Sequence, residues 1–252
     1  MKRSGEKEMM DFPGQPRELL EDDLKNLRLI NRYLGGCRCV VRGIEQSVRR
    51  HRLQSFALLD VGTGSGDIPA RITEWAQQRG IKTSIVALEP DPVTARVAAT
   101  LTQQTNPPFI PLLQRGKEGD FRRCGISVVR GDATAPPFAA GSFDFVLTSQ
   151  LLHHFNDEQI IALLRTWARL ARRAILVADL VRHPVAYYGI RLLTTIFTRN
   201  RMTRTDAPLS VQRACTIAEW TDLLRRADVG TLRIQWVFPF RMLALISLQN
   251  GS

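Results

Sequence analysis

The clearest chemical signal in the sequence is a glycine-rich segment with acidic side chains on both sides. Residues 58–67 read Leu-Leu-Asp-Val-Gly-Thr-Gly-Ser-Gly-Asp, an apolar run followed by alternating glycines. Glycine allows a tight turn and lets the backbone approach a ligand where a Cβ would clash. The spacing differs from both the dinucleotide-binding and the P-loop pattern. Because Asp60 and Asp67 would repel a pyrophosphate, the segment favours a ligand with an ammonium group and hydroxyls.

Two further acids follow later apolar segments of the chain. Glu89 ends the next such segment, where α/β nucleotide-binding folds place an acid that accepts hydrogen bonds from both ribose hydroxyls. Asp132 lies in Gly-Asp-Ala at 131–133, a position suited to accept from the exocyclic amine of adenine. Together these acids predict that the ligand is an adenosine with a positively charged tail.

A pair of histidines, His153 and His154, stands in Leu-Leu-His-His-Phe directly after a strand-like segment. If the acceptor of a transferred group is a hydroxyl, an imidazole commonly removes its proton. We therefore expect His154, and after it His153, to act as the base, although such pairs also serve in packing. The sequence predicts no metal site.

Acceptor-binding candidates come from a later, arginine-rich segment: His183, Tyr187 and Arg191. His183 precedes Pro184, which is also typical of a polar residue ahead of a helix. Arg191 interrupts an apolar stretch, whereas Arg199, Arg201 and Arg204 are more typical of a solvated face.

The elements that must position these residues alternate between strand-like and helix-like patterns after residue 55, which predicts a parallel sheet with crossover helices. The expected strands are 56–61, 83–89, 126–130, 143–148 and 173–179, and the expected helices are 67–79, 92–103 and 157–171. A helix over 216–227 then precedes strands near 231–238 and 241–247, whose short connection allows only antiparallel pairing. The predicted fold class is α/β, a Rossmann-like three-layer sandwich with a mostly parallel seven-stranded sheet that ends in an antiparallel hairpin.

We expect three parts in the chain. Residues 1–54 form an N-terminal helical segment with amphipathic helices near 18–34 and 38–52. Residues 55–180 and 216–252 form the core. Residues 181–215 form a helical cap inserted after the fifth strand, where the carboxyl ends of the strands face the ligand crevice.

Four ordered motifs of this sequence resemble those of the class I S-adenosylmethionine-dependent methyltransferases, in particular the branch that acts in ubiquinone and menaquinone biosynthesis. The motifs are residues 60–67, Ala-Leu-Glu-Pro-Asp-Pro at 87–92, 131–133 with Pro137-Phe138, and Ser-Phe-Asp-Phe-Val at 142–146. The resemblance covers about residues 50–180 and implies S-adenosylmethionine as the cofactor.

The resemblance also implies a role for individual residues. The methionine moiety of the cofactor is expected against Gly62, Thr63, Gly64 and Gly66. The nucleoside is expected against Glu89 at the ribose, Pro90 near the adenine, and Asp132 and Ala133 at the adenine edge, with Ser149 lining the methyl-donor site.

The chain carries 35 Lys and Arg against 24 Asp and Glu, a formal net charge of +11. Such an excess suits nucleic acid, a membrane surface or an anionic ligand and selects none of them. The basic residues lack interleaved aromatic residues that would stack bases, so we expect no nucleic-acid partner. Asn-Pro-Pro-Phe at 106–109 resembles the tetrapeptide of amino-methylating enzymes, but it precedes the third strand rather than following the fourth and is predicted to be loop.

The sequence also bears on the compartment. Its first residues show no secretory signal, and no stretch reaches the length and apolar character of a membrane span. Cys37, Cys39, Cys124 and Cys215 match no disulfide framework or zinc motif, so we expect free thiols and a cytoplasmic location.

We therefore expect a methyltransferase that acts on a hydroxyl of a small aromatic or polyketide-like acceptor. The nearest alternative is C-methylation of a quinol in quinone biosynthesis. A nucleic-acid methyltransferase and an inactive cofactor-binding protein rank lower. The identity of the acceptor and a homodimer formed through the N-terminal helices stay open at this point.

Overall fold

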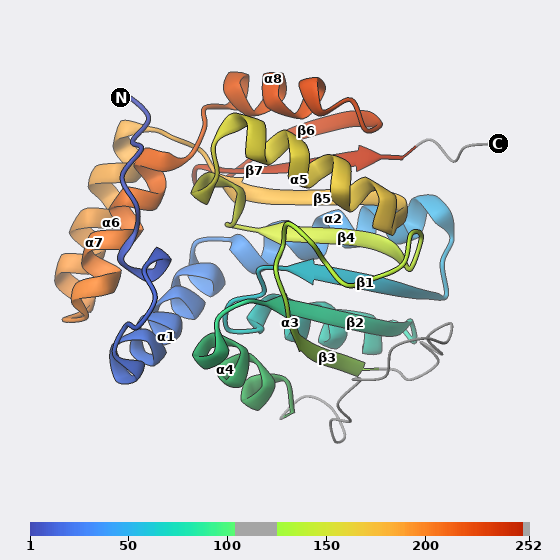
Figure 1. Cartoon of the computed structure of the whole chain (residues 1–252), viewed down its shortest axis with the longest axis horizontal. Helices are drawn as coiled ribbons and strands as arrows, with labels where there is room; N and C mark the ends of the chain where they lie inside the picture. The colour runs from blue at the N-terminus through green and yellow to red at the C-terminus, as the bar shows by residue number, and fades with distance from the viewer. Residues whose placement is uncertain (104–124, 249–252) are drawn as a thin grey trace.

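The computed structural model describes residues 1–103 and 125–248, whose centre is a seven-stranded sheet (Figure 1). The strands are β1 (Ser55–Val61), β2 (Lys82–Glu89), β3 (Gly125–Arg130), β4 (Phe143–Ser149), β5 (Ala171–Leu180), β6 (Thr231–Val237) and β7 (Arg241–Ser247). Their order is β3-β2-β1-β4-β5-β7-β6. Strand β7 is antiparallel to both of its neighbours, and the other pairs are parallel. The predicted fold class is confirmed.

Helices cover both faces of this sheet. They are α1 (Arg17–Tyr33), α2 (Gly36–His51), α3 (Asp67–Gln77), α4 (Pro92–Gln103), α5 (Asp157–Leu170), α6 (Pro184–Phe197), α7 (Arg201–Arg213) and α8 (Ile217–Ala227), with short 3₁₀ turns η1 (Met9–Asp11) and η2 (Leu152–His154). One apolar cluster joins α2 and α3 to the sheet, and another joins α5 and α8 to its opposite face.

The sequence of β1 explains why both faces are covered. Leu58 belongs to the cluster under α2 and α3, and Leu59 belongs to the cluster under α5 and α8. Successive residues of a strand point to opposite faces, so a central strand of a doubly covered sheet is apolar throughout. Every residue of β1 after Ser55 is buried.

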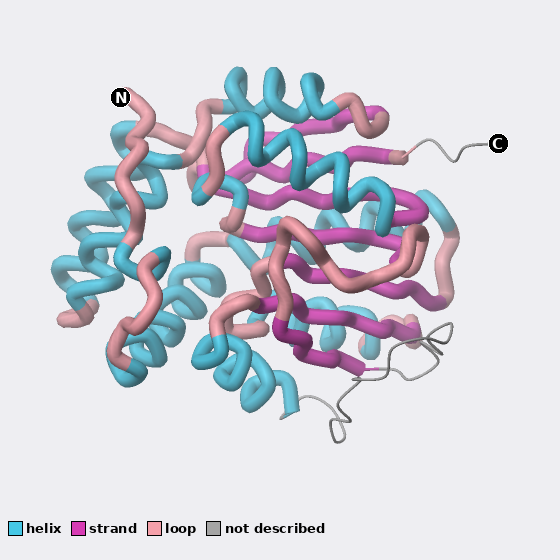
Figure 2. Tube along the Cα trace, viewed as in Figure 1, coloured by secondary structure: helices cyan, strands magenta, loops and turns pink. Residues whose placement is uncertain are grey.

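The carboxyl ends of the parallel strands all lie at one edge of the sheet, and the N-terminal segment, α6 and α7 lie across this edge (Figure 1 and Figure 2). Helices α6 and α7 make up most of residues 181–215, the segment between β5 and α8 that the sequence predicts to be a cap. They pack on each other through Ile190, Ala207 and Val211, and Ile30 and Leu34 of the α1 region pack against the same cluster.

The structure also bears on the predicted free thiols, the proline tetrapeptide and the predicted absence of a membrane span. Cys37, Cys39 and Cys215 are free thiols, whereas Cys124 lies outside the described residues, as does the tetrapeptide at 106–109. Among the helices that the structure describes, none is both long and apolar enough to cross a membrane.

Candidate functional site

The glycine turn after β1 forms a cradle whose inner side is open. Gly62 and Thr63 donate their backbone N–H groups to the Leu88 carbonyl at 2.9 and 3.1 Å, which ties the turn to β2. Gly62 has φ +69°, and a Cβ there would lie 2.8 Å from the Leu151 side chain. Gly64 has φ +57°, but a Cβ there would meet nothing within 4 Å. A side chain at Gly64 would occupy the space above the turn, so glycine leaves this space free.

Two buried carboxyl groups border the turn from neighbouring strands. Asp60 of β1 accepts a hydrogen bond from the Thr63 hydroxyl at 2.7 Å. Glu89, at the end of β2, accepts from the backbone N–H groups of Gly64 at 3.0 Å and Asp91 at 3.3 Å. Burial raises the pKa of each carboxyl to about 7, although these hydrogen bonds lower it. Neither carboxyl forms an ion pair with a described basic side chain, so the turn lacks a positive partner.

The end of α1 reaches the other side of the turn. Asp67, the first residue of α3, accepts hydrogen bonds from the Ser65 hydroxyl at 3.0 Å and from the Asn31 amide at 3.3 Å. Asn31 in turn accepts from the Gln150 amide. Gln150 follows β4 with φ +55°, an uncommon conformation for a residue with a side chain. These contacts connect the turn with the segment that leads to the histidine pair.

The residues expected at the adenine and methyl-donor positions lie at the same sheet edge. The Asp132 side chain accepts from the Thr134 N–H at 2.8 Å, and the buried Ala133 offers its carbonyl to the Trp167 indole N–H at 2.9 Å. Pro90 is exposed. The Ser149 hydroxyl, at the end of β4, is buried without a hydrogen-bond partner. Such an orphaned polar group calls for an explanation, and a bound ligand would supply one.

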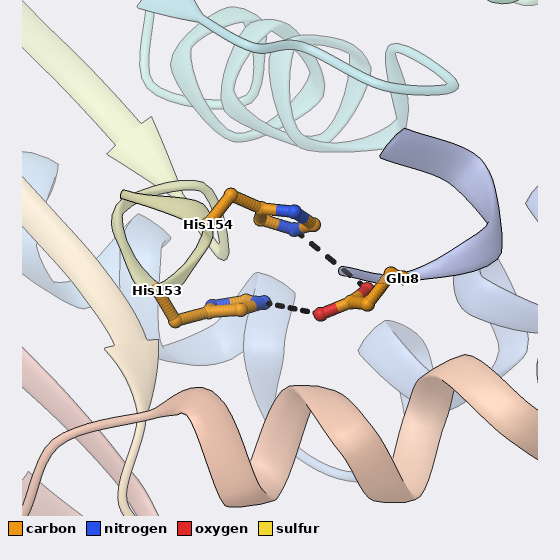
Figure 3. Close-up of side chains that lie close together, drawn as sticks. All are labelled: Glu8, His153 and His154. Carbon is orange, nitrogen blue, oxygen red and sulfur yellow. Dashed lines mark ion pairs between the residues drawn. The ribbon is translucent and has the colours of Figure 1, made fainter. Parts of the chain in front are cut away.

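The histidine pair lies in η2, directly after β4, and each ring is held by a carboxylate. His153 Nδ1 is 2.7 Å from an oxygen of Asp179, and His154 Nδ1 is 2.6 Å from an oxygen of Asp11. The two Nε2 atoms point toward the buried carboxylate of Glu8, at 3.6 Å from His153 and 3.8 Å from His154 (Figure 3). These last distances exceed a hydrogen bond. Each Nε2 is thus free of a hydrogen bond to Glu8.

Arg213 of α7 completes this cluster with a positive charge. It donates to the carbonyls of His153 at 3.2 Å and His154 at 2.8 Å, and it pairs with Asp11. Its guanidinium is 3.8 Å from Glu8 Oε1. Burial raises the pKa of Glu8 to about 7, against the opposing charges of His154 and Arg213. Burial also acts to raise the pKa of Asp11, but hydrogen bonds from His154 and Arg213, together with the electrostatic effect of His154, hold it well below its usual range.

Glu8, His153 and His154 also have a composition that transition metals bind, with ligand atoms within 4.8 Å of one another. However, the guanidinium of Arg213 already supplies positive charge at Glu8. The expectation of no metal stays a prediction.

The three acceptor-binding candidates lie apart from the histidine pair. His183 is exposed, caps α6 by accepting from the Val185 N–H at 3.2 Å, and stacks on Phe240. Tyr187 is half-buried in the contact between α6 and α7, and Arg191 is exposed. None of the three forms a hydrogen bond, ion pair or ring contact with His153 or His154. Their role in acceptor binding stays a prediction.

Sequence reasoning missed four residues of the histidine cluster: Glu8, Asp11, Asp179 and Arg213. Asp179 could have been found, because it lies near the carboxyl end of a buried parallel strand, as Asp60 and Glu89 do. Glu8 and Asp11 stand in an N-terminal segment that carries no motif. Arg213 was one of many arginines in the insertion.

Comparisons with known proteins agree with this architecture. Residues 59–177 match a family model described as a methyltransferase domain. No curated protein matches the sequence significantly. Similar solved structures include human N-acetylserotonin methyltransferase in complex with SAM, at 16% identity and a TM-score of 0.61, over 94% of this chain and 57% of that one.

Two further structures are similar over most of their length. A Methanococcus maripaludis protein assigned to the S-adenosylmethionine-dependent methyltransferases shares 14% identity, with a TM-score of 0.58, over 96% of this chain and 99% of that one. Magnesium protoporphyrin IX methyltransferase from Synechocystis, with bound SAH, shares 12% identity, with a TM-score of 0.54, over 87% of each chain. At these identities the likeness shows the fold alone, and the chain spans little more than half of the human enzyme.

Proposed function

We propose that the chain, whose residues 59–177 match a methyltransferase domain, is a class I S-adenosylmethionine-dependent methyltransferase that transfers a methyl group to a hydroxyl of a small aromatic or polyketide-like acceptor. The observation that carries this proposal is the position of His154. It directly follows β4, the sheet neighbour of β1, and its Nδ1 is held by Asp11. A basic nitrogen thus stands at the same sheet edge as the glycine turn.

The residues around the turn fit the proposed cofactor. The open space at Gly64 admits the methionine part, and the unpaired Asp60 and Glu89 carboxylates suit a cation and ribose hydroxyls. Asp67 and Thr63 border the same space. Pro90, Asp132 and Ala133 would hold the adenine, and the unpartnered Ser149 hydroxyl would face the methyl-donor end. A phosphate would meet two carboxyl groups here and no described basic side chain.

The bound cofactor supplies a methyl group on a cationic sulfur, which is a good leaving group. The task of the chain is to hold a nucleophile in line with the methyl carbon and to exclude water. Since Asp11 holds Nδ1 of His154, its Nε2 is the nitrogen that accepts the proton of the acceptor hydroxyl. His153 is almost completely buried, so it is better placed to support His154 than to touch the acceptor.

Besides His154, Glu8 is a second group that can hold the proton removed from the acceptor hydroxyl. Its carboxyl faces Nε2 of both histidines and has a pKa of about 7, raised by burial. The apolar side chains of Met9 and Met10, next to Glu8, pack with α1 and α7 and shield this segment from water.

The finer assignments are proposals of the same kind. A deprotonated quinol is a nucleophile at carbon as well as at oxygen. C-methylation of a quinol is therefore the alternative, and analysis of the product distinguishes it from O-methylation. The free thiols Cys37, Cys39 and Cys215 support a cytoplasmic location. The partner that we propose is the small acceptor and no nucleic acid.

A labelled-methyl assay with a panel of phenolic acceptors tests this function. We expect His154→Asn to lower kcat by about 10²- to 10⁴-fold, the usual contribution of a general base, while the affinity for S-adenosylmethionine stays unchanged. His153→Asn should lower kcat less. The matched control is His51→Asn, because His51 lies on α2, away from the cluster.

The outcome separates the alternatives. Label in an O-methyl ether supports the proposal, and label on a ring carbon supports quinol C-methylation. If cofactor binds but none of the hydroxyl acceptors is labelled, or if His154→Asn keeps full kcat, the proposed chemistry is wrong.

A further inference from the structure

Helix α6 presents an apolar face that nothing in the described chain covers. Its exposed members are Val185 (60% exposed), Tyr188 (65%), Leu192 (61%), Leu193 (39%), Ile196 (63%) and Phe197 (79%). Val185, Tyr188, Leu192 and Ile196 are three or four residues apart, and Leu193 and Phe197 flank them on the same side of the helix. The opposite side, with Ile190 and Thr194, is buried. A contiguous apolar face of this kind on a protein surface marks an interaction site.

A chain of aromatic rings extends this face toward the turn between β6 and β7. His183, the N-cap of α6, stacks on Phe240, with ring centroids 4.8 Å apart. Phe240 contacts Trp236, which also contacts Phe238. Trp236 and Phe238 are 53% and 75% exposed. We name this surface, made of the exposed apolar residues of α6 with Trp236 and Phe238, the α6 face.

Exposed arginines border the α6 face. Arg191 lies on α6 itself, and Arg199, Arg201 and Arg204 follow its end; all four are exposed. The sequence from 181 to 205 contains no Asp or Glu. Arg182 is the exception among the arginines of this stretch, because it is buried and paired with Glu219. Asp22 of α1, which accepts a hydrogen bond from Asn200, offsets one charge at most.

We propose that the α6 face binds the surface of a bilayer that contains anionic lipids. A helix with an apolar side and flanking arginines lies in the plane of the interface, with its apolar side among the acyl chains and its cations at the headgroups. Tryptophan and tyrosine favour the same headgroup level. The proposal is independent of the identity of the methyl acceptor.

The charge pattern favours a bilayer over a second copy of the chain. In a symmetric dimer, the same surface of both copies would meet, so the arginines of one α6 face would lie near those of the other. Segment 181–205 brings no carboxylate that would pair with them. Like charges that are brought together in an interface are costly. Anionic headgroups remove this cost.

Cosedimentation of the full chain with vesicles tests the proposal. We expect binding to vesicles of phosphatidylcholine with phosphatidylglycerol and much weaker binding to phosphatidylcholine alone. Leu192→Glu with Ile196→Glu should abolish binding without unfolding the chain, since both residues are exposed. Circular dichroism confirms that this variant is folded.

A charge-matched pair of variants isolates the arginines. Arg199→Glu with Arg201→Glu should weaken binding to anionic vesicles by about tenfold or more, because each basic residue near such a surface is worth about fivefold. Arg225→Glu with Arg226→Glu makes the same change in net charge at the far end of α8 (Figure 1) and should bind like the unaltered chain.

Three outcomes would overturn the proposal. The first is an unaltered chain that stays in the supernatant with anionic vesicles. The second is equal weakening by the two arginine pairs, which would mean unspecific attraction. The third is a dimer in sedimentation velocity that the Leu192→Glu, Ile196→Glu variant dissociates, with no vesicle binding, which would assign the face to a second copy.

Discussion

The two halves of the candidate site, the glycine turn and the histidine pair, both contain buried acids but surround them with different partners. At the glycine turn, Asp60 and Glu89 are buried, have pKa values of about 7 and face no described cation. At the histidine pair, Glu8, Asp11 and Asp179 face two imidazoles and the guanidinium of Arg213. The first half lacks a positive partner among the described residues, whereas the second contains Arg213 and two imidazoles as partners of its acids.

This difference indicates what each half does. A buried carboxylate without a cationic partner is stabilised when a positively charged ligand binds next to it. A site in which imidazoles alternate with carboxylates is suited to holding and passing a proton. The candidate site thus combines buried acids without a cationic partner and a cluster in which imidazoles and carboxylates are in contact, the arrangement on which the proposed methyl transfer depends.

The largest effect is expected where the internal balance of the histidine half is broken. Arg213→Met should lower the free energy of unfolding by about 3–5 kcal/mol, because it leaves Glu8 and Asp11 without their buried partner. Chemical denaturation measures this loss. Arg169→Met, an exposed arginine of α5, is the control and should cost little. Equal, small losses in both variants would mean that the cluster does not depend on Arg213.

The second largest effect concerns the glycine half. Glu89→Ala should weaken binding of S-adenosylmethionine by about 100-fold or more, since hydrogen bonds to a charged group contribute about 1.5–3 kcal/mol each. The stability of the ligand-free chain should change less, because the loss of two backbone hydrogen bonds is offset by the removal of a buried carboxyl without a cationic partner. Calorimetry measures the affinity, and Glu158→Ala, exposed on α5, is the control. Unchanged affinity in Glu89→Ala would separate this acid from the cofactor site.

The pH dependence of binding sharpens the comparison further. A cation and hydroxyl donors bind the charged form of Glu89, whose pKa is about 7 without ligand, so binding releases a proton. Affinity should therefore fall by about tenfold between about pH 8 and about pH 6. Titrations in buffers of different ionisation enthalpy detect the released proton, and Glu89→Gln should flatten the profile. Affinity that rises on acidification would contradict the account.

The same shift makes an opposite prediction for the ligand-free fold. A carboxyl whose folded pKa lies above its unfolded value favours the folded state while it is protonated, and this contribution is lost as the pH rises through about 7. The thermal midpoint of the chain without cofactor should therefore decrease through this range, and saturating cofactor should reduce the decrease. Thermal denaturation across this pH range, with and without cofactor, measures it.

The smallest effect is expected from chelation. If Arg213 and protons balance the histidine half, EDTA should leave the rate of methyl transfer unchanged, and added Zn²⁺ or Mn²⁺ should not raise it. Elemental analysis of the purified chain gives an independent measure. Loss of activity on chelation, restored by one metal, would assign Glu8, His153 and His154 to that metal.

The glycine half could be predicted from the sequence because its residues are local. Asp60, Gly62 and Gly64 lie in one turn, and Glu89 ends the neighbouring strand, so alternation of strands and helices suffices to bring them together. The antiparallel end of the sheet was predictable for the same reason, since only a short connection separates β6 from β7.

The histidine half could be predicted only in part. His153 and His154 directly follow β4, but Asp11 reaches His154 across 143 positions of sequence. Its segment is placed by tertiary contacts, among them the backbone N–H groups of Met9 and Met10 that bond to Asp206 on α7. No periodicity or motif indicates such a contact. Carboxylates that come from a distant segment of the chain therefore cannot be predicted from local sequence patterns.

Calorimetric titration of the purified chain with S-adenosylmethionine tests whether the glycine turn and its acids bind this cofactor. We expect one saturable site, with proton release, and no binding of ATP or NADH under the same conditions. Absence of binding by S-adenosylmethionine and its demethylated product, together with saturable binding of ATP or NADH, would contradict this expectation.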